Sequence, residues 1–303
     1  MNSSRTALVT GAAGIIGPSI CRELKNQGWR VAAAERSLES FERHRQFHNE
    51  PHSADAFFAA DLSDAAACTR LVHEVEERMG PVALLVNNAT GSTSPPASFA
   101  EATPEYCHQV MAVDVLAAVC LSQAALPSLR SNHGQIINIS SIQVRHFYRG
   151  RFIYAAAKAA LETLTEAMAF ELQDEGIRVN DVRVGSIPGD AFLRPALEKL
   201  EPALAARIHA EVMATHYAEK RKSGLPCGTP QDVAEAIAFL ASPAARFING
   251  AVIPVDGAFG AARARLAIEG IEARPKHADV TVHDLWHKEP ERALAEWVKA
   301  NQS

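Results

Sequence analysis

The chain has 303 residues, of which 48% are hydrophobic and 21% charged, and its formal net charge at pH 7 is −5. This length fits one large α/β domain or two small ones, and the composition is that of a globular protein with a sizeable core. The acidic balance argues against nucleic-acid binding, which normally requires a basic excess.

Targeting and metal signals are weak. Five scattered cysteines, never in a C-x-x-C pair, indicate reduced thiols and a cytoplasmic protein. The N-terminus has no signal-peptide pattern, and no apolar run approaches the roughly 18 to 20 residues of a membrane helix. His44, His48 and His52 have the spacing of a metal-binding face, but Pro51 interrupts that helix, so we interpret a solvated face and predict no metal.

The first elements predict a nucleotide site. The apolar run 7–10 predicts a buried strand, and Thr10-Gly11-Ala-Ala-Gly14-Ile-Ile-Gly17 separates it from a helical pattern that ends near Gly28. Glycines let the backbone approach a pyrophosphate, and a helix N-terminus supplies free N–H groups and positive partial charge. We therefore predict dinucleotide binding at this turn.

A second strand, residues 29–36, ends in Glu35 and Arg36. Glu35 lies at about the distance from the glycine turn that is expected for a carboxylate on the adenosine ribose, which favours NAD over NADP because it repels a 2′-phosphate. Arg36 could stack beside adenine, or neutralise that phosphate and admit NADP. A solvated Glu-Arg pair is the alternative interpretation.

Strands and helices then alternate. Further strands are predicted at residues 57–62, 81–90, 134–141, 176–185 and 251–257, and the polar residues that follow them include Asp61, Asn87 and Asn88. Such alternation predicts a right-handed parallel sheet with helices on both faces, with ligands bound outside the carboxyl ends of the strands. We predict a Rossmann-type, doubly wound, three-layer αβα domain over residues 1–260. Ser63 is the predicted cap of the helix that starts at Ala65.

Two segments lie outside this alternation. Residues 188–226 form a charged helical insert, interpreted as a lid over the site or as a static surface hairpin. The tail, 261–303, carries a predicted helix over 289–301 and is expected to pack on the domain or on a neighbouring subunit.

One helix carries the chemistry. It opens with Tyr154 and Lys158, whose four-residue spacing places them one turn apart on the same face. An ammonium beside a phenol favours the phenolate, so the sequence predicts a lowered pKa for Tyr154. Ser141, at the end of the strand 134–141, can present a hydroxyl to the same pocket. A Tyr-x-x-x-Lys pair also occurs by chance, so the interpretation depends on the surrounding motifs.

Together these motifs resemble a short-chain dehydrogenase/reductase over residues 5–260. The resemblance implies Tyr154 as general acid/base, Ser141 as the group that orients the substrate oxygen, and Lys158 as a partner of Tyr154 and of the nicotinamide ribose. It also implies a homodimer or homotetramer paired through the helices that contain Asp114 and Tyr154. The cofactor contacts implied include Gly11, Gly14, Ile16, Gly17, Glu35, Arg36, Tyr154 and Lys158. Within this set of contacts, Asp61 and Leu62 are expected at adenine, Asn88 on the adenosine side, and Ile187 at the nicotinamide carboxamide.

The chain departs from the family's pattern in two informative places. The glycine motif reads TGxxGxxG, where the single-domain branch of the family has TGxxxGxG. Asp114 stands where the family has an asparagine that completes a proton relay. A carboxylate there is expected to hold a water and to raise the pKa of Lys158.

The loop between Ser141 and Tyr154 suggests the substrate. It carries Arg145, His146, Arg149 and Arg151, a cationic rim in an acidic protein, which favours an anionic substrate such as a hydroxy acid or sugar acid. Gln143 could bond a substrate hydroxyl. A solvated loop or a subunit contact is the alternative.

Three functions are compatible with these residues. The first is an NAD(P)-dependent oxidoreductase that interconverts a secondary alcohol and a ketone of a small molecule. The second is a sugar-nucleotide epimerase or dehydratase, suggested by TGxxGxxG. The third is a non-catalytic nucleotide sensor, suggested by Asp114. The intact Ser141, Tyr154 and Lys158 favour the first.

Overall fold

A computed structural model describes residues 5–42, 53–92, 98–189, 197, 200–222, 226–261 and 292. The chain divides into two units. The first comprises Met1–Glu42, His52–Val184 and Pro230–Val255, and the second comprises Arg43–Pro51, Gly185–Thr229 and Asp256–Ser303. All strands of the described residues belong to the first unit.

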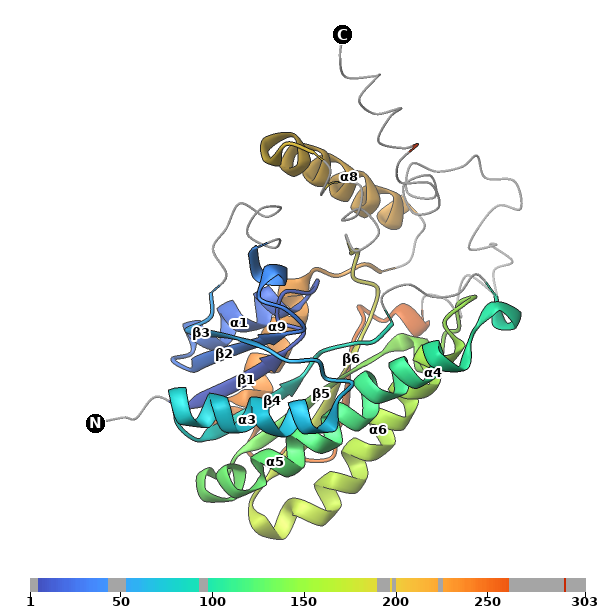
Figure 1. Cartoon of the computed structure of the whole chain (residues 1–303). Coiled ribbons are helices and arrows are strands. Elements are labelled where there is room, and N and C mark those ends of the chain that lie inside the picture. Colours follow the sequence, from blue (N-terminus) through green and yellow to red (C-terminus); the bar gives the residue numbers. More distant parts are fainter. Residues whose placement is uncertain are drawn as a thin grey trace. The chain divides into compact units, whose positions relative to one another are not determined.

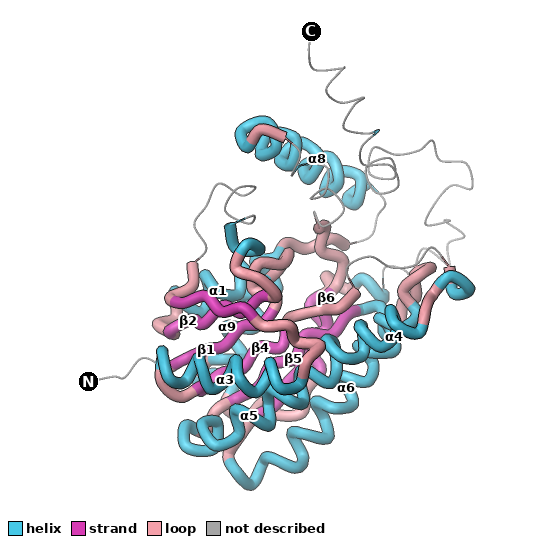
Figure 2. The backbone as a smooth tube through the Cα atoms, in the orientation of Figure 1, coloured by secondary structure: helices cyan, strands magenta, loops and turns pink. Residues whose placement is uncertain are grey.

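Seven parallel strands form one sheet in the order β3-β2-β1-β4-β5-β6-β7 (Figures 1 and 2). The strands are β1 Thr6–Thr10, β2 Arg30–Glu35, β3 Ala56–Ala59, β4 Val82–Asn87, β5 Gln135–Ser141, β6 Arg178–Val184 and β7 Val252–Val255. The winding direction reverses between β1 and β4, which confirms the predicted doubly wound sheet. The carboxyl ends of these two strands therefore border the crevice where such sheets bind ligands.

Helices cover both faces of the sheet (Figure 1). They are α1 Gly17–Asn26 and α9 Pro230–Ala241 on one face, with α3 Ala65–Met79, α4 Pro104–Met111, α5 Ala117–Asn132 and α6 Phe152–Leu172 on the other. This arrangement is the predicted three-layer αβα sandwich. With both faces covered, the central strands β1, β4 and β5 are buried along their whole length, which explains the mainly apolar sequences of β1 and β4.

A large part of the core lies between the sheet and the helices α3 and α5. Leu8, Leu85 and Ile136, one from each central strand, are fully buried there. Burying one such side chain stabilises the fold by about 1.5–3 kcal/mol relative to leaving it exposed. Phe58 of the edge strand β3 is buried while its neighbour Phe57 is half-exposed, as expected where a strand alternates between core and surface.

A chain of buried polar groups joins two central strands to α6. The Asn87 side-chain amide donates to Asn138 Oδ1 at 2.9 Å, and the Asn138 amide donates to Thr165 Oγ1 at 2.8 Å. Thr165 in turn donates to the carbonyl of Leu161 at 2.9 Å. These bonds hold α6, which carries Tyr154 and Lys158, in a defined register against the sheet.

The start of α3 corrects one prediction. The N-cap is Asp64, whose side chain accepts from the Ala66 N–H at 2.9 Å, and not Ser63. Ser63 instead donates through its N–H and its hydroxyl to Asp61. The carboxylate of Asp64 lies one residue closer to the helix, so it reaches the first free N–H groups.

α4 and α5 form one continuous helix, Pro104–Asn132, through a π-helical turn at Ala112–Leu116 called η2. By length and composition alone this helix could cross a membrane. Its inner residues Leu121, Ala125 and Leu129 belong to the core cluster, so we assign it to the core. The extra residue of the π-turn bends the local path at Asp114, and such turns are frequent at functional sites.

The second unit contains the helix α8, Pro202–Lys222, with Ala205, Ile208 and Val212 buried. Gly228 donates its N–H to the Ser186 carbonyl at 3.1 Å. The lid role of residues 188–226 stays a prediction. The three spaced histidines 44, 48 and 52 and the predicted helix 289–301 lie outside the described residues, apart from Arg292.

Thr165 and Thr163 offer a matched test of the buried polar chain. Both hydroxyls donate to the carbonyl four residues earlier on α6, but Thr165 is buried and Thr163 is exposed. We expect Thr165→Val to lower the free energy of unfolding by about 1–3 kcal/mol, because the Asn138 amide loses its acceptor. Thr163→Val should change it by less than about 0.5 kcal/mol. Equal values in urea unfolding would contradict the proposed role of the chain of bonds.

Candidate active site

The glycine turn after β1 is tightly packed. Gly11 has φ +60°, and a Cβ there would lie 2.8 Å from the Ala89 Cα. A Cβ at Gly17 would lie 2.5 Å from the Gly11 carbonyl oxygen. α1 starts at Gly17 after Ile16, and no side chain caps this end. The first N–H groups of α1 are therefore left to a ligand, and a phosphate suits such a helix N-terminus.

Glu35 lies beside this turn, as the sequence predicted. Its Oε2 accepts from the Ala13 N–H at 3.3 Å, and its Oε1 accepts from the Arg36 N–H at 3.1 Å. The Arg36 side chain is exposed. Asp61 lies close enough for Arg36 to contribute to lowering its pKa, although the hydrogen bonds from Ser63 contribute more.

Asn88 connects β4 to the glycine turn. Its side-chain amide donates to the carbonyls of Thr10 and Gly11, each at 2.9 Å. The Thr10 hydroxyl accepts from the N–H groups of Asn88 and Ala89. Asn88 thus joins the end of β4 to the glycine turn and fixes the shape of that turn.

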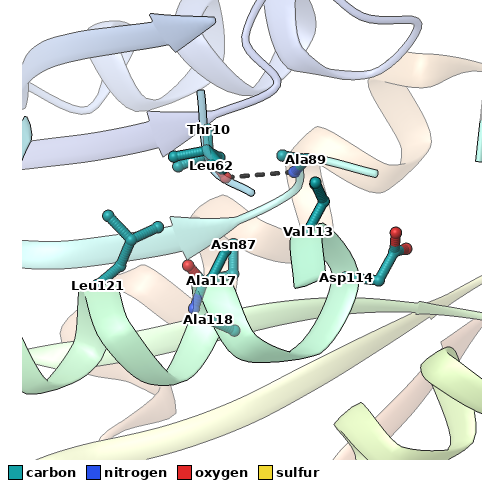
Figure 3. A pocket seen from close by; sticks show the side chains of 9 residues that line it. All are labelled: Thr10, Leu62, Asn87, Ala89, Val113, Asp114, Ala117, Ala118 and Leu121. Atoms are coloured by element: carbon teal, nitrogen blue, oxygen red, sulfur yellow. Dashed lines mark hydrogen bonds between the residues drawn. The ribbon is translucent and has the colours of Figure 1, made fainter. Parts of the chain in front are cut away.

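A small pocket opens where these elements meet (Figure 3). It is lined by the predicted residues Leu62 and Asp114 and by Thr10, Asn87, Ala89, Val113, Ala117, Ala118 and Leu121. The pocket brings together the carboxyl ends of β1 and β4, the segment after β3 and the π-turn. The structure thus gathers residues up to about a hundred positions apart at the edge of the sheet that the sequence predicted.

Tyr154 and Lys158 lie on one face of α6. The Lys158 ammonium is 5.7 Å from the centroid of the Tyr154 ring. It is also 2.9 Å from Oδ1 of Asp114, and both of these charged side chains are almost fully buried. Burial by itself lowers the pKa of Lys158, but Asp114 and Tyr154 outweigh it, and the pKa lies above its ordinary value. The predicted effect of Asp114 on Lys158 is confirmed.

Asp114 does more than the sequence suggested. Its Oδ2 accepts from the Gly91 N–H at 2.7 Å and from the Thr90 hydroxyl at 3.2 Å. The carboxylate, expected to hold a water, is thus engaged by protein donors at both oxygens. It links Lys158 to the segment after β4, and it supplies a negative charge and a second acceptor oxygen that an asparagine amide lacks.

Ser141 ends β5 and is buried, and its Oγ accepts from the Gln143 N–H at 3.2 Å. The side-chain oxygen of Gln143 is buried and has no hydrogen-bond partner within the described ranges. An unpaired buried acceptor is costly, so this oxygen is a candidate ligand contact. Arg145 and Arg149 are exposed, in agreement with a cationic rim.

Arg151 does not belong to this rim. Its guanidinium donates to the carbonyl and the hydroxyl of Ser92, at 3.1 and 2.8 Å, and lies 5.7 Å from the Tyr154 ring centroid. Sequence spacing alone could not show that Arg151 binds Ser92 while Arg145 and Arg149 are exposed. Ile187 lies in the second unit, and its contact with a nicotinamide stays a prediction.

Sequence reasoning missed a polar cluster behind Lys158. Ser140, Glu162, Asp181 and Arg183 are joined by hydrogen bonds between β5, α6 and β6. The available signal was the sequence of β6, in which the charged residues Asp181 and Arg183 alternate with valines of the predicted strand.

Comparisons with known proteins agree with this geometry. A family model described as Enoyl-(Acyl carrier protein) reductase matches residues 11–259. The chain is 35% identical over 255 residues to an acetoacetyl-CoA reductase of Rhizobium meliloti (strain 1021), which covers 84% of this chain and 98% of the relative. It is 32% identical over 260 residues to a cis-4-hydroxycyclohexanecarboxylate dehydrogenase of Sinomonas cyclohexanicum, covering 86% and 98%. It is 33% identical over 256 residues to a galactitol 2-dehydrogenase (L-tagatose-forming) of Cereibacter sphaeroides, covering 84% and 94%.

The buried ion pair can be tested by removing its acid. We expect Asp114→Ala to lower the free energy of unfolding at pH 7 by about 3–5 kcal/mol, because the Lys158 ammonium is left buried without a counter-charge. Asp114→Asn should cost less, since its amide oxygen still accepts a hydrogen bond. Glu74→Ala, which breaks the exposed pair with Arg78, is the control and should cost less than about 1 kcal/mol. Similar losses for Asp114→Ala and Glu74→Ala would contradict the assignment.

Proposed function

The chain belongs to the short-chain dehydrogenase/reductase family, and from this premise we propose that it interconverts a secondary alcohol and a ketone with a nicotinamide dinucleotide. Membership of this family makes it an oxidoreductase that acts on CH–OH and C=O groups. The observation that carries the proposal is Tyr154 on the same helical face as the buried ammonium of Lys158, close to the crevice of the sheet.

The glycine turn fits a dinucleotide. Side chains at Gly11 or Gly17 would collide with backbone atoms, so the loop stays close to the start of α1, where N–H groups and positive partial charge suit a pyrophosphate. Gly14, Ile16, Asp61, Leu62 and Asn88 lie in or beside the same turn and complete the proposed contacts. When bound, the dinucleotide supplies or accepts the hydride.

Glu35 supports NAD as the preferred cofactor. Its carboxylate is held against the Ala13 N–H at the glycine turn, where it can accept hydrogen bonds from the two hydroxyls of the adenosine ribose. A 2′-phosphate at this place would meet a negative charge. The Arg36 side chain is exposed nearby and could neutralise that phosphate, so NADP is proposed as a second cofactor that binds more weakly.

The proton chemistry follows from the charges around Tyr154. In alcohol oxidation its phenolate takes the hydroxyl proton, and in ketone reduction its phenol returns one to the oxygen. The Lys158 ammonium stabilises the phenolate, and Asp114 keeps that ammonium charged and in place. Ser141 would donate a hydrogen bond to the reacting oxygen and so orient it.

The substrate end of the site is cationic. Arg145 and Arg149 are exposed in the loop that follows Ser141, and the unpaired Gln143 oxygen can accept from a hydroxyl. We infer a hydroxy or keto acid, or a sugar acid, as the substrate class. The relative from Sinomonas cyclohexanicum, whose name specifies a hydroxycarboxylate, supports this class.

We also propose a cytoplasmic homodimer or homotetramer. Leu116 of the π-turn and Phe170 of α6 are exposed at 58% and 76%, and a second copy could cover such apolar side chains. The five cysteines, all within the described part of the chain, form no disulfide, which suits a reducing compartment. A mass of one chain in light scattering would exclude the oligomer.

An assay of the purified protein tests both the reaction and the substrate class. The panel pairs hydroxy acids and sugar acids with their neutral esters or polyols, each with NAD and NADP. We expect net reduction of NAD and a preference for the acid of each pair. Arg145→Glu with Arg149→Glu should lower that preference by roughly ten-fold or more, whereas Arg70→Glu on α3 should not. Conversion of a sugar nucleotide without net cofactor consumption would support an epimerase instead.

Tyr154→Phe tests the acid/base assignment. We expect kcat to fall by about 10²–10⁴-fold, with the Kd for NADH changed by less than about three-fold, because the ring and the packing of α6 are kept. Tyr106→Phe removes a hydroxyl that bonds Ser92 and should leave kcat nearly unchanged. Turnover by Tyr154→Phe at the parent rate would contradict the mechanism.

A further inference from the structure

A cluster of charged groups lies directly behind Lys158. Glu162 is one helical turn further along α6, Ser140 precedes Ser141 on β5, and Asp181 and Arg183 lie on β6. Asp181 and Ser140 are buried, and Glu162 is only 9% exposed. Asp181 and Lys158 are close enough to shift each other's pKa.

The hydrogen bonds show where a proton must be. Ser140 Oγ is 2.9 Å from Glu162 Oε1 and makes a second short contact with Asp181 Oδ1. A hydroxyl has one hydrogen, so it can donate to only one carboxyl group. The other carboxyl group must therefore donate its own proton to the serine oxygen.

Arg183 identifies which carboxyl group is protonated. Its guanidinium donates to both oxygens of Glu162, each at 2.7 Å, an arrangement that requires the ionised carboxylate. The proton is therefore on Asp181. The residues opposite Asp181 on the adjacent strands are the neutral Asn138 and Val252, and neither supplies a positive charge. Burial, together with the Glu162 charge, raises the pKa of Asp181 to about 7, although Ser140, Lys158 and Arg183 oppose this shift.

The charge balance agrees with this assignment. Two cations, Lys158 and Arg183, face the acids Asp114, Glu162 and Asp181. With Asp181 protonated, the cluster is neutral, whereas an ionised Asp181 would leave one uncompensated negative charge in a medium of low dielectric constant.

We propose that Asp181 is a positioning residue for the active site: its carboxyl group keeps a proton and donates a hydrogen bond to Ser140, which donates its own hydrogen to Glu162. Asp181 so keeps a further negative charge away from Lys158 and Tyr154. This role rests on the proposed function. Loss of the proton to solvent leaves two carboxylates competing for the single Ser140 hydrogen, and it adds a charge that opposes the phenolate of Tyr154.

Asp181→Asn is the matched variant, because an amide N–H donates to Ser140 as the protonated acid does but cannot ionise. A carboxyl group with a raised pKa binds its proton more tightly in the folded protein. The wild type therefore loses stability as pH rises from about 4 to about 7, and Asp181→Asn avoids this loss. We expect the Tm advantage of Asp181→Asn to grow by roughly 5 °C between pH 5 and pH 8.

Asp61→Asn is the control for a carboxyl group with the opposite shift. Hydrogen bonds from Ser63 lower the pKa of Asp61, so its contribution to stability is already complete above about pH 4, and the Tm difference between Asp61→Asn and the wild type should stay constant from pH 5 to pH 8. A Tm difference between Asp181→Asn and the wild type that does not change with pH would overturn the proposal.

Lys158 reports on the active site without any need for turnover. In protein labelled with ¹³C at the lysine Cε, and assigned with Lys158→Arg, the Lys158 resonance should shift near neutral pH in the wild type and not in Asp181→Asn. With a substrate in hand, the ratio of kcat/KM for alcohol oxidation, Asp181→Asn over wild type, should rise about three-fold or more from pH 6 to pH 8. An identical Lys158 titration or a flat ratio would overturn the positioning role, whereas absence of turnover from both proteins would contradict the proposed function instead.

Discussion

The ion pair between Lys158 and Asp114 is the interaction on which the site depends. Both charges are almost completely withdrawn from water, and neither would be tolerated there without the other. The pair joins α6, which carries Tyr154, to the π-turn, and through the second carboxylate oxygen to the segment after β4. One contact therefore holds three of the elements that border the proposed substrate and cofactor.

Hydrogen bonds between the sheet and α6, made by neutral and charged polar side chains, hold Lys158 in place for this ion pair. The chain Asn87–Asn138–Thr165 fixes the register of α6 from the side of the central strands. The cluster around Ser140 and Asp181 lies next along the same helix. In a closely packed interior each buried polar group must find a hydrogen-bond partner. Because Asp181 and Lys158 belong to neighbouring buried clusters, the protonation state of Asp181 affects the electrostatic environment of the Lys158 ammonium.

The same packing shows which side-chain contacts of the site local spacing could predict. Tyr154 and Lys158 meet because a helix repeats every 3.6 residues, a local property that spacing reveals. Asn88 was assigned to the adenosine side, and the structure shows its amide bonded to the carbonyls of Thr10 and Gly11. Arg151 was grouped with Arg145 and Arg149, yet it donates to Ser92. The Arg151 contact and the amide bonds of Asn88 both involve partners distant in the chain, and the place of Asn88 on the adenosine side stays a prediction.

By itself, the sequence determined the class of fold, and it predicted the edge of the sheet for the site and the group of Ser141, Tyr154 and Lys158. These follow from periodicity, glycine placement and the rule that parallel strands end at a common edge. Only the tertiary structure decided that Asp114 binds Lys158 directly and that Asp181, Glu162 and Arg183 form one cluster. Side-chain contacts between β5, α6 and β6 depend on how the strands pair and on how the helix packs against them. No local sequence pattern specifies which side chains these elements bring together.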